Sequence, residues 1–127
     1  MSYADEAIKA VYAFHEAFGN VDVPGMADAC NFPHVRLAQG SFTITETRED
    51  FIERSKDLKQ RLEAEGWART HTESVDVIHE GPDKVHFAIV NKRQHQDGTT
   101  YKPFNTFWIV TLQDGKWGIQ FRSSYLT

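Results

Sequence analysis

From Val85 to Leu126 the chain reads VHFAIVNKRQHQDGTTYKPFNTFWIVTLQDGKWGIQFRSSYL. Three runs of alternating apolar and polar residues lie in this stretch, joined at Asp97-Gly98 and Asp114-Gly115. An Asp-Gly pair between alternating hydrophobics is the strongest short-range signal for a hairpin, because both turn residues must tolerate positive φ. The stretch therefore predicts three antiparallel strands joined by two tight turns.

Two-residue turns also fix which residues face one another across neighbouring strands. Here they place Phe87 opposite Trp108, and Trp108 opposite Phe121. One face of the three strands then carries Val85, Phe87, Ile89, Asn91, Arg93, Lys102, Phe104, Thr106, Trp108, Val110, Leu112, Trp117, Ile119, Phe121, Ser123 and Tyr125. The apolar members gather at one end of this face and the polar members at the other, which predicts a core that opens into a pocket.

The chain before this stretch predicts three helices and three further strands. Apolar residues recur at three- and four-residue spacing in the first segment, which is typical of an amphipathic helix. The expected helices cover residues 3–19, run from residue 22 to a stop at Pro33, and cover residues 47–66. The expected strands are two short ones over 35–38 and 41–44 and a long one over 67–80. If Val75 and Val77 of the long strand face inward, the residues that follow the same alternation are Arg69, His71 and Glu73.

Composition and charge limit the class of protein. The 127 residues, of which 40% are hydrophobic and 25% charged, predict one globular domain over residues 1–127. The net charge of −4, with no cluster of Lys or Arg, argues against nucleic acid and anionic membranes as partners. A single cysteine, no signal-peptide pattern and no apolar run near the roughly 20 residues of a spanning helix predict a cytoplasmic protein.

The order of elements predicts an α+β fold with helices packed on one side of a sheet. In this order, and in the segments FPHVR at 32–36 and DGKWGI at 114–119 followed by RSS at 122–124, the chain resembles the NTF2-like superfamily. That superfamily includes SnoaL-like polyketide cyclases, ketosteroid isomerase and scytalone dehydratase. The resemblance spans the chain and implies an NTF2-like cone, with three N-terminal helices on a strongly curved, mainly antiparallel sheet with a pocket. It decides no activity, because the superfamily holds hydrolases, isomerases, dehydratases, cyclases and binding modules.

The first candidate site is the polar end of the predicted inner face. A histidine beside a carboxylate and an arginine provides the groups that acid–base catalysis uses. We therefore expect His71 as the acid or base, Glu73 as the group that orients it, and Arg69 or Arg93 as the electrostatic group. The alternative is an ion-pair network at a solvated rim, which contributes little to stability.

Further residues are expected to line the pocket. Tyr12 and His15 lie on or beside the apolar stripe of the first helix, and His34 is a base or hydrogen-bond donor at the start of the first short strand; packing at the core edge is the alternative. No Asp or Glu occurs from Pro33 to Ser41, where ketosteroid isomerases carry the carboxylate that moves the proton. The expected ligand-binding residues are Tyr12, His34, Asn91, Arg93, Phe104, Thr106, Trp108, Phe121, Ser123 and Tyr125.

The sequence predicts no metal and no cofactor. His71 and Glu73 share a strand face without an evident third ligand, and the other histidines are scattered. No Gly-rich phosphate loop follows a strand. Cys30 lacks a charged or motif context, so it is expected to be a small buried hydrophobe.

The outer face of the sheet predicts a homodimer. Val90, Phe107 and Ile109 cluster there on adjacent strands, and a two-fold interface would bury them. The alternative is a few isolated exposed hydrophobics, which are ordinary on any surface.

Three functions stay open at this point. The first is a cofactor-independent isomerase, dehydratase, cyclase or hydrolase acting on a small, partly apolar molecule that is anionic or contains a carbonyl group. The second is a module that binds such a ligand and does not turn it over. The third is an association domain whose dimer surface is the function.

Overall fold

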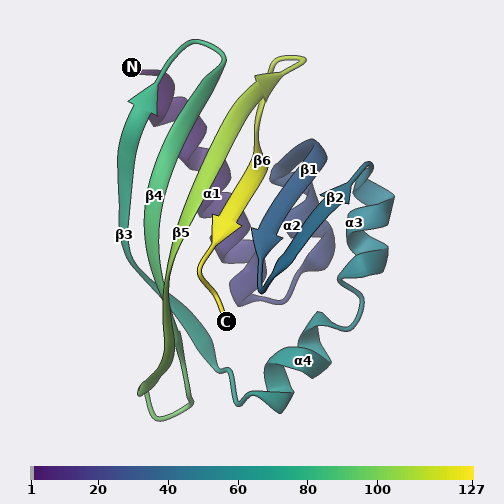
Figure 1. Cartoon of the computed structure of the whole chain (residues 1–127), viewed down its shortest axis with the longest axis vertical. Coiled ribbons are helices and arrows are strands. Elements are labelled where there is room, and N and C mark those ends of the chain that lie inside the picture. Colours follow the sequence, from purple (N-terminus) through teal and green to yellow (C-terminus); the bar gives the residue numbers. More distant parts are fainter. Residues whose placement is uncertain (1) are drawn as a thin grey trace.

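The computed structural model describes residues 2–127, and its elements follow one another in the predicted order. Two helices come first, α1 (Tyr3–Gly19) and α2 (Val23–Asp28), before the hairpin of β1 (Cys30–Ala38) and β2 (Ser41–Thr45). The remaining elements are α3 (Arg48–Arg54), α4 (Leu58–Ala64), β3 (Arg69–Glu80), β4 (Lys84–Gln94), β5 (Thr100–Gln113) and β6 (Lys116–Ser124) (Figure 1).

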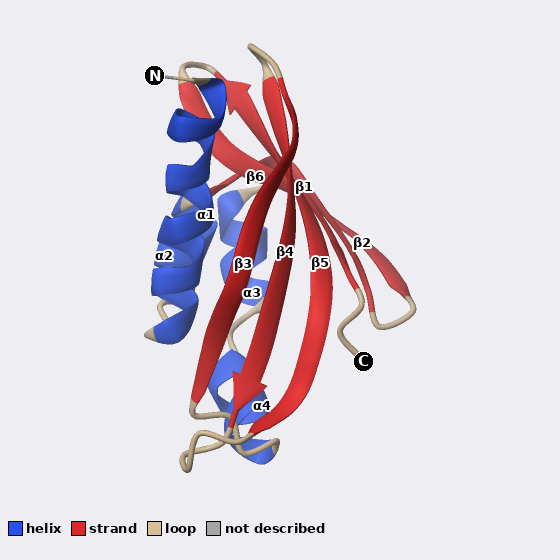
Figure 2. Cartoon of the chain, turned by 90° about the vertical axis from the view of Figure 1, so that its left-hand side faces the viewer, coloured by secondary structure: helices blue, strands red, loops and turns tan. Residues whose placement is uncertain are grey.

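All six strands form one sheet, in the order β2-β1-β6-β5-β4-β3. Every pair of neighbours is antiparallel except β1 and β6, which run parallel. Figure 2 shows the strands strongly bent, with α1 and α2 on one side of them. This is the predicted α+β arrangement of helices on one side of a curved sheet.

Helix α1 begins where Ser2 and Asp5 form a capping box and bond each other's backbone N–H groups. Its buried side includes Val11 and Phe14, and the Phe14 ring lies 5.2 Å from the Trp108 ring of β5 in an edge-to-face contact. This contact fixes the helix over the concave face of the sheet. Cys30 is buried, as expected from its context.

Two of the expected helices differ from the structure. The third is divided into α3 and α4, because the backbone leaves the helix at Ser55 and starts again at Leu58. No glycine or proline marks that break, and the apolar residues keep a helical spacing through it. The sequence pattern therefore predicts one continuous helix. The second helix ends at Asp28, and β1 begins two residues later, well before Pro33.

The parallel pairing of β1 with β6 depends on a glycine. A Cβ at Gly118 would lie 2.6 Å from Cγ of Asn31 on β1. Any larger residue at position 118 would therefore clash with the Asn31 side chain. The Asn31 Nδ2 group donates hydrogen bonds to the backbone oxygens of Thr111 at 2.9 Å and Lys116 at 3.2 Å. Asn31 thereby joins the first strand to the last hairpin.

The predicted register is confirmed between β4 and β5 from Phe87 opposite Trp108 to Arg93 opposite Lys102. It shifts beside the turn, where Gln94 pairs with Thr100 and His95 bonds Thr99, so the predicted two-residue turn is wrong. Between β5 and β6 the predicted register holds only as far as the pairing of Val110 with Ile119, because the next pair is Ile109 with Phe121. Gln120 is therefore an extra residue that forms a β-bulge. After this bulge, each side chain of β6 lies on the face of the sheet opposite to the predicted one. Trp108 faces Arg122, and the predicted pairing of Trp108 with Phe121 is wrong.

A second bulge has the same effect on β3. Thr72 pairs with Asn91 and Ser74 pairs with Val90, so Glu73 is the extra residue. Before this bulge the inward residues are the threonines at 70 and 72, and Arg69 and His71 lie on the outer face. The expectation that the charged residues of β3 face inward is wrong for this reason.

Candidate functional site

A cavity of about 520 Å³ lies between the helices and the concave face of the sheet, and every helix and strand contributes to its lining. Its apolar walls come from Phe14, Phe18, Met26, Phe51, Leu58, Leu62, Phe104, Trp108 and Leu126. Small-molecule sites in proteins commonly measure about 300–1,000 Å³. The fold therefore encloses a space of the size that a small organic ligand needs.

The charged lining of the cavity is almost entirely arginine. Five of the chain's seven arginines line it and none of its seven lysines does: Arg36, Arg54, Arg61, Arg93 and Arg122. Glu65 is the one acidic residue among the lining residues of the described chain. The cavity is therefore strongly positive, although the whole chain carries a net charge of −4.

Arg122 is positioned by a buried histidine. Nδ1 of His34 lies 2.9 Å from the backbone oxygen of Ile119 and donates to it, which leaves Nε2 to accept a hydrogen bond from Nε of Arg122 at 3.1 Å. Burial lowers the pKa of His34 to about 3, so its ring is neutral. Burial also lowers the pKa of Arg122 to about 10, which still leaves a cation at neutral pH. The guanidinium lies 4.8 Å from the centre of the Phe14 ring.

Arg36 lies directly opposite Arg122, on the neighbouring strand. Burial lowers the pKa of Arg36, and the positive charges of Arg93 and Arg61 lower it further. Within residues 2–127, no carboxylate lies within 4.0 Å of either the Arg36 or the Arg122 guanidinium. Two cations thus face the cavity side by side without a counter-ion from the protein.

A second neutral histidine lies at the floor of the cavity. Nδ1 of His15 donates to the backbone oxygen of Val11 at 3.0 Å, and Nε2 accepts from the Asn91 amide at 3.2 Å. The Asn91 oxygen in turn accepts from Thr72 at 2.8 Å, and the His15 ring stacks on Trp108. Burial lowers the pKa of His15 to about 4, so both buried histidines are uncharged at neutral pH.

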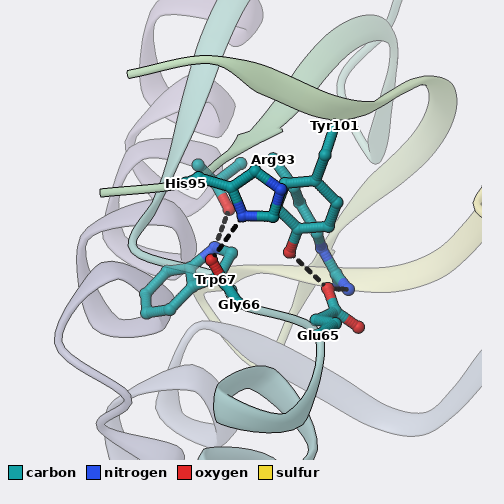
Figure 3. Close-up of polar contacts among 7 residues, drawn as sticks. Glu65, Gly66, Trp67, Arg93, His95 and Tyr101 are labelled. Carbon is teal, nitrogen blue, oxygen red and sulfur yellow. Dashed lines mark hydrogen bonds and ion pairs between the residues drawn. The ribbon is translucent and has the colours of Figure 1, made fainter. Parts of the chain in front are cut away.

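Glu65 and Arg93 form an ion pair at the other end of the cavity (Figure 3). The Glu65 carboxylate accepts from Nη1 of Arg93 at 2.8 Å and from the Tyr101 hydroxyl at 2.6 Å. Burial acts to raise the pKa of Glu65, but these two hydrogen bonds outweigh it and the net pKa is lowered. The Arg93 guanidinium also lies over the rings of Phe18 and Phe104.

Six of the expected ligand-binding residues line this cavity: His34, Asn91, Arg93, Phe104, Thr106 and Trp108. Four do not. Tyr12 and Tyr125 are exposed, and Phe121 and Ser123 belong to the part of β6 that the bulge turns outward. Those four expectations are wrong as statements about the cavity lining.

The structure does not bring the expected catalytic residues together. His71 is exposed on the outer face, and Arg69 donates to the backbone oxygen of His95 at 3.1 Å. Glu73 forms an exposed ion pair with Lys92 at 3.0 Å. None of the three lines the cavity.

The charged lining residues that are absent from the expected site set are four arginines and one acid: Arg36, Arg54, Arg61, Arg122 and Glu65. Strict alternation along β6 placed Arg122 on the outer face, and the bulge reverses this. Gly118 is the one signal that the sequence offers, because a glycine inside a strand often marks a bulge or a close approach of two backbones.

Among residues 2–127, no group of three or more His, Cys, Asp or Glu side chains is placed to hold a metal ion. In the same part of the chain, no helix has the length and apolar character needed to cross a membrane.

A family described as NTF2-like protein (DUF6841) matches residues 5–124. Among solved structures, an NTF2-like protein of unknown function from Shewanella oneidensis MR-1 is 13% identical, with a TM-score of 0.75 and coverage of 96% of this chain and 98% of that one. A domain of unknown function with a cystatin-like fold from Nostoc punctiforme PCC 73102 is 16% identical, with a TM-score of 0.78 and coverage of 100% and 80%.

A ketosteroid isomerase-like protein from Erwinia carotovora atroseptica SCRI1043 is 14% identical, with a TM-score of 0.68 and coverage of 96% of this chain and 94% of that one. No curated protein matches the chain. At these identities the likeness shows the fold alone, and it confirms the predicted NTF2-like cone.

Proposed function

We propose that this chain, which belongs to the family of NTF2-like proteins (DUF6841), binds a small organic anion in its arginine-lined cavity. The observation that carries the proposal is the pair Arg36 and Arg122, which face the cavity with no carboxylate partner within residues 2–127. A charge removed from water is costly unless it is paired. A ligand that brings a negative charge supplies that missing partner.

The type of cation supports the same ligand class. Arginine presents a planar fork of N–H donors that fits a carboxylate or phosphate, whereas lysine is a point charge. The aromatic walls around Phe14 and Trp108 suit an apolar ligand body. The ligand is therefore an anionic group attached to an apolar skeleton.

Binding without turnover fits the geometry better than acid–base catalysis. The lone pair of His15 is used by Asn91 and that of His34 by Arg122. Glu65 is held by Arg93 and Tyr101. A group that moves a proton needs a free lone pair or proton directed at the substrate. We therefore favour a binding module over a cofactor-independent isomerase, dehydratase, cyclase or hydrolase.

A matched pair of ligands tests the proposal. Naphthoate is expected to raise the thermal midpoint of unfolding and to bind about 10- to 100-fold more tightly than naphthamide, because a hydrogen bond to a charged group contributes about 1.5–3 kcal/mol. Isothermal titration calorimetry measures both affinities. Equal binding of the amide would show that the arginines do not select an anion.

We also propose that the outer face of the sheet is a homodimer interface. Two rows of outward side chains cross β2, β1, β6 and β5: Ile44, Val35, Phe121 and Ile109 in one row, and Phe42, Leu37, Ser123 and Phe107 in the other. Phe42 and Ile44 are 62% and 46% exposed. The bulge in β6 adds Phe121 to this face, which extends the apolar patch expected around Val90, Phe107 and Ile109.

Substitution within these rows tests the interface. Ile109→Lys and Phe121→Lys are each expected to convert a dimer of about twice 14.6 kDa into a monomer in light-scattering measurements, because a lysine on each copy would be buried without a partner. Tyr12→Lys is the matched control, since Tyr12 is exposed on α1. A monomeric wild type at micromolar concentration would contradict the proposal.

A further inference from the structure

We propose further that the anionic group of the ligand is a tetrahedral dianion, of the phosphate monoester or phosphonate class. It would be held by a row of side chains that crosses four strands. This inference rests on the proposed function and narrows it to one class of anion.

The row follows from the strand register. Thr43 on β2 faces Arg36 on β1, Arg36 faces Arg122 on β6, and Arg122 faces Trp108 on β5. All four residues line the cavity. Because neighbouring strands lie about 4.8 Å apart, a single small group can reach the hydroxyl and both guanidinium groups. The indole of Trp108 closes the row on its apolar side.

The charges in the cavity require more than one negative charge. Arg61 is paired with Asp57 at 3.2 Å, and Arg93 with Glu65 at 2.8 Å. Arg54 is exposed and lies near the Ile44 backbone oxygen. Two cations are left, Arg36 and Arg122, and the neutral His34 beside them compensates neither. One carboxylate would balance one of them, whereas a dianion balances both.

The available donors also match a tetrahedral group. Arg122 uses Nε on His34, so its two Nη groups are left for a ligand. Together with the Arg36 fork and the Thr43 hydroxyl, they form three sets of donors along the row. A phosphoryl group offers three strong acceptor oxygens, whereas a carboxylate offers two. The shape of the site therefore favours the same class as its charge.

Three probes with the same ring and different head groups separate charge from shape. Naphthyl phosphonate is a tetrahedral dianion at about pH 8, naphthalene sulfonate is a tetrahedral monoanion, and naphthoate is a planar monoanion. Calorimetry at constant ionic strength is expected to show the phosphonate binding about tenfold or more tightly than the sulfonate, because only the dianion compensates both arginines. The sulfonate is expected to bind about threefold more tightly than naphthoate, because it offers three acceptor oxygens to the donors of the row and naphthoate offers two.

A variant tests the role of the second cation. Arg36→Gln is expected to remove most of the phosphonate preference while the sulfonate loses about threefold or less, because one remaining cation satisfies a monoanion. Arg48→Gln is the control, since Arg48 is exposed and paired with Asp28.

Each outcome decides one of the two claims. If the sulfonate and naphthoate bind as tightly as the phosphonate, or if Arg36→Gln weakens all three equally, the dianion inference is overturned and the proposed binding of organic anions stands. If none of the three probes binds the folded protein, the proposed function itself fails.

Discussion

Arg122→Met is expected to weaken the binding of organic anions by about 100-fold or more and to raise the free energy of unfolding of the ligand-free protein by about 1 kcal/mol. The two effects have opposite signs because Arg122 stabilises the bound ligand but, as an unpaired charge, destabilises the ligand-free protein. Its guanidinium is half-buried, its pKa is lowered by desolvation, and it has no carboxylate partner within residues 2–127. Methionine fills a similar volume without a charge, although it leaves the Nε2 atom of His34 without a donor.

Calorimetry gives the affinity and chemical denaturation gives the stability of this variant. Arg69→Met is the matched control, because Arg69 is exposed on the outer face and does not line the cavity. It is expected to change neither quantity appreciably. If Arg69→Met abolished binding and Arg122→Met did not, the site would lie at the exposed cluster of β3 and our assignment would be wrong.

Acidification from pH 6.5 to about pH 5 is expected to lower the free energy of unfolding by about 3 kcal/mol. Burial holds the pKa of His15 at about 4 and that of His34 at about 3, below the ordinary 6.5. Below pH 6.5 the unfolded chain therefore binds two protons that the folded chain does not bind. Stability is fully present above pH 6.5 and falls as the pH falls towards the two folded values.

Urea denaturation between about pH 5 and pH 8 measures this dependence, whose slope approaches about 1.4 kcal/mol per pH unit for each histidine below pH 6.5 and vanishes towards pH 8. The pKa of Glu65 is lowered from 4.5, so its contribution is lost only below this window. His15→Gln and His34→Gln are each expected to halve the slope. His71→Gln, at an exposed position, is expected to leave it unchanged. An unchanged slope in the double variant of His15 and His34 would contradict the prediction.

Much of the fold follows from the sequence because local signals decide it. The alternating apolar residues of β4 and β5 pair Phe87 with Trp108 as predicted, and the same alternation places Asn91 and Arg93 at the cavity. The apolar spacing of α1 places Phe14 against the sheet. From Phe87 to Arg93 in β4, and along α1, the spacing of the apolar residues is uninterrupted.

The candidate site could not be predicted in the same way, because one extra residue in a strand reverses every side chain beyond it. Glu73 does this in β3 and Gln120 in β6. The sequence of β6 fits either orientation, because the pair Phe121 and Ser123 and the pair Arg122 and Ser124 each combine residues that can face a cavity. The pairing of β6 with β1 and β5 decides which of the two orientations forms, and alternation along β6 alone does not predict that pairing.

The parallel pairing of β1 with β6 determines when the cavity can form during synthesis. His34 and Ile119 bond across 85 positions of the chain, so the β1–β2 hairpin has no neighbouring strand until β6 has left the ribosome. Contacts between such distant positions form late, because the loop must close before they stabilise anything. A nascent chain that stalls before β6 therefore has neither the continuous six-stranded sheet nor the adjacent pair of guanidinium groups. Added ligand can rescue only chains that have passed this point.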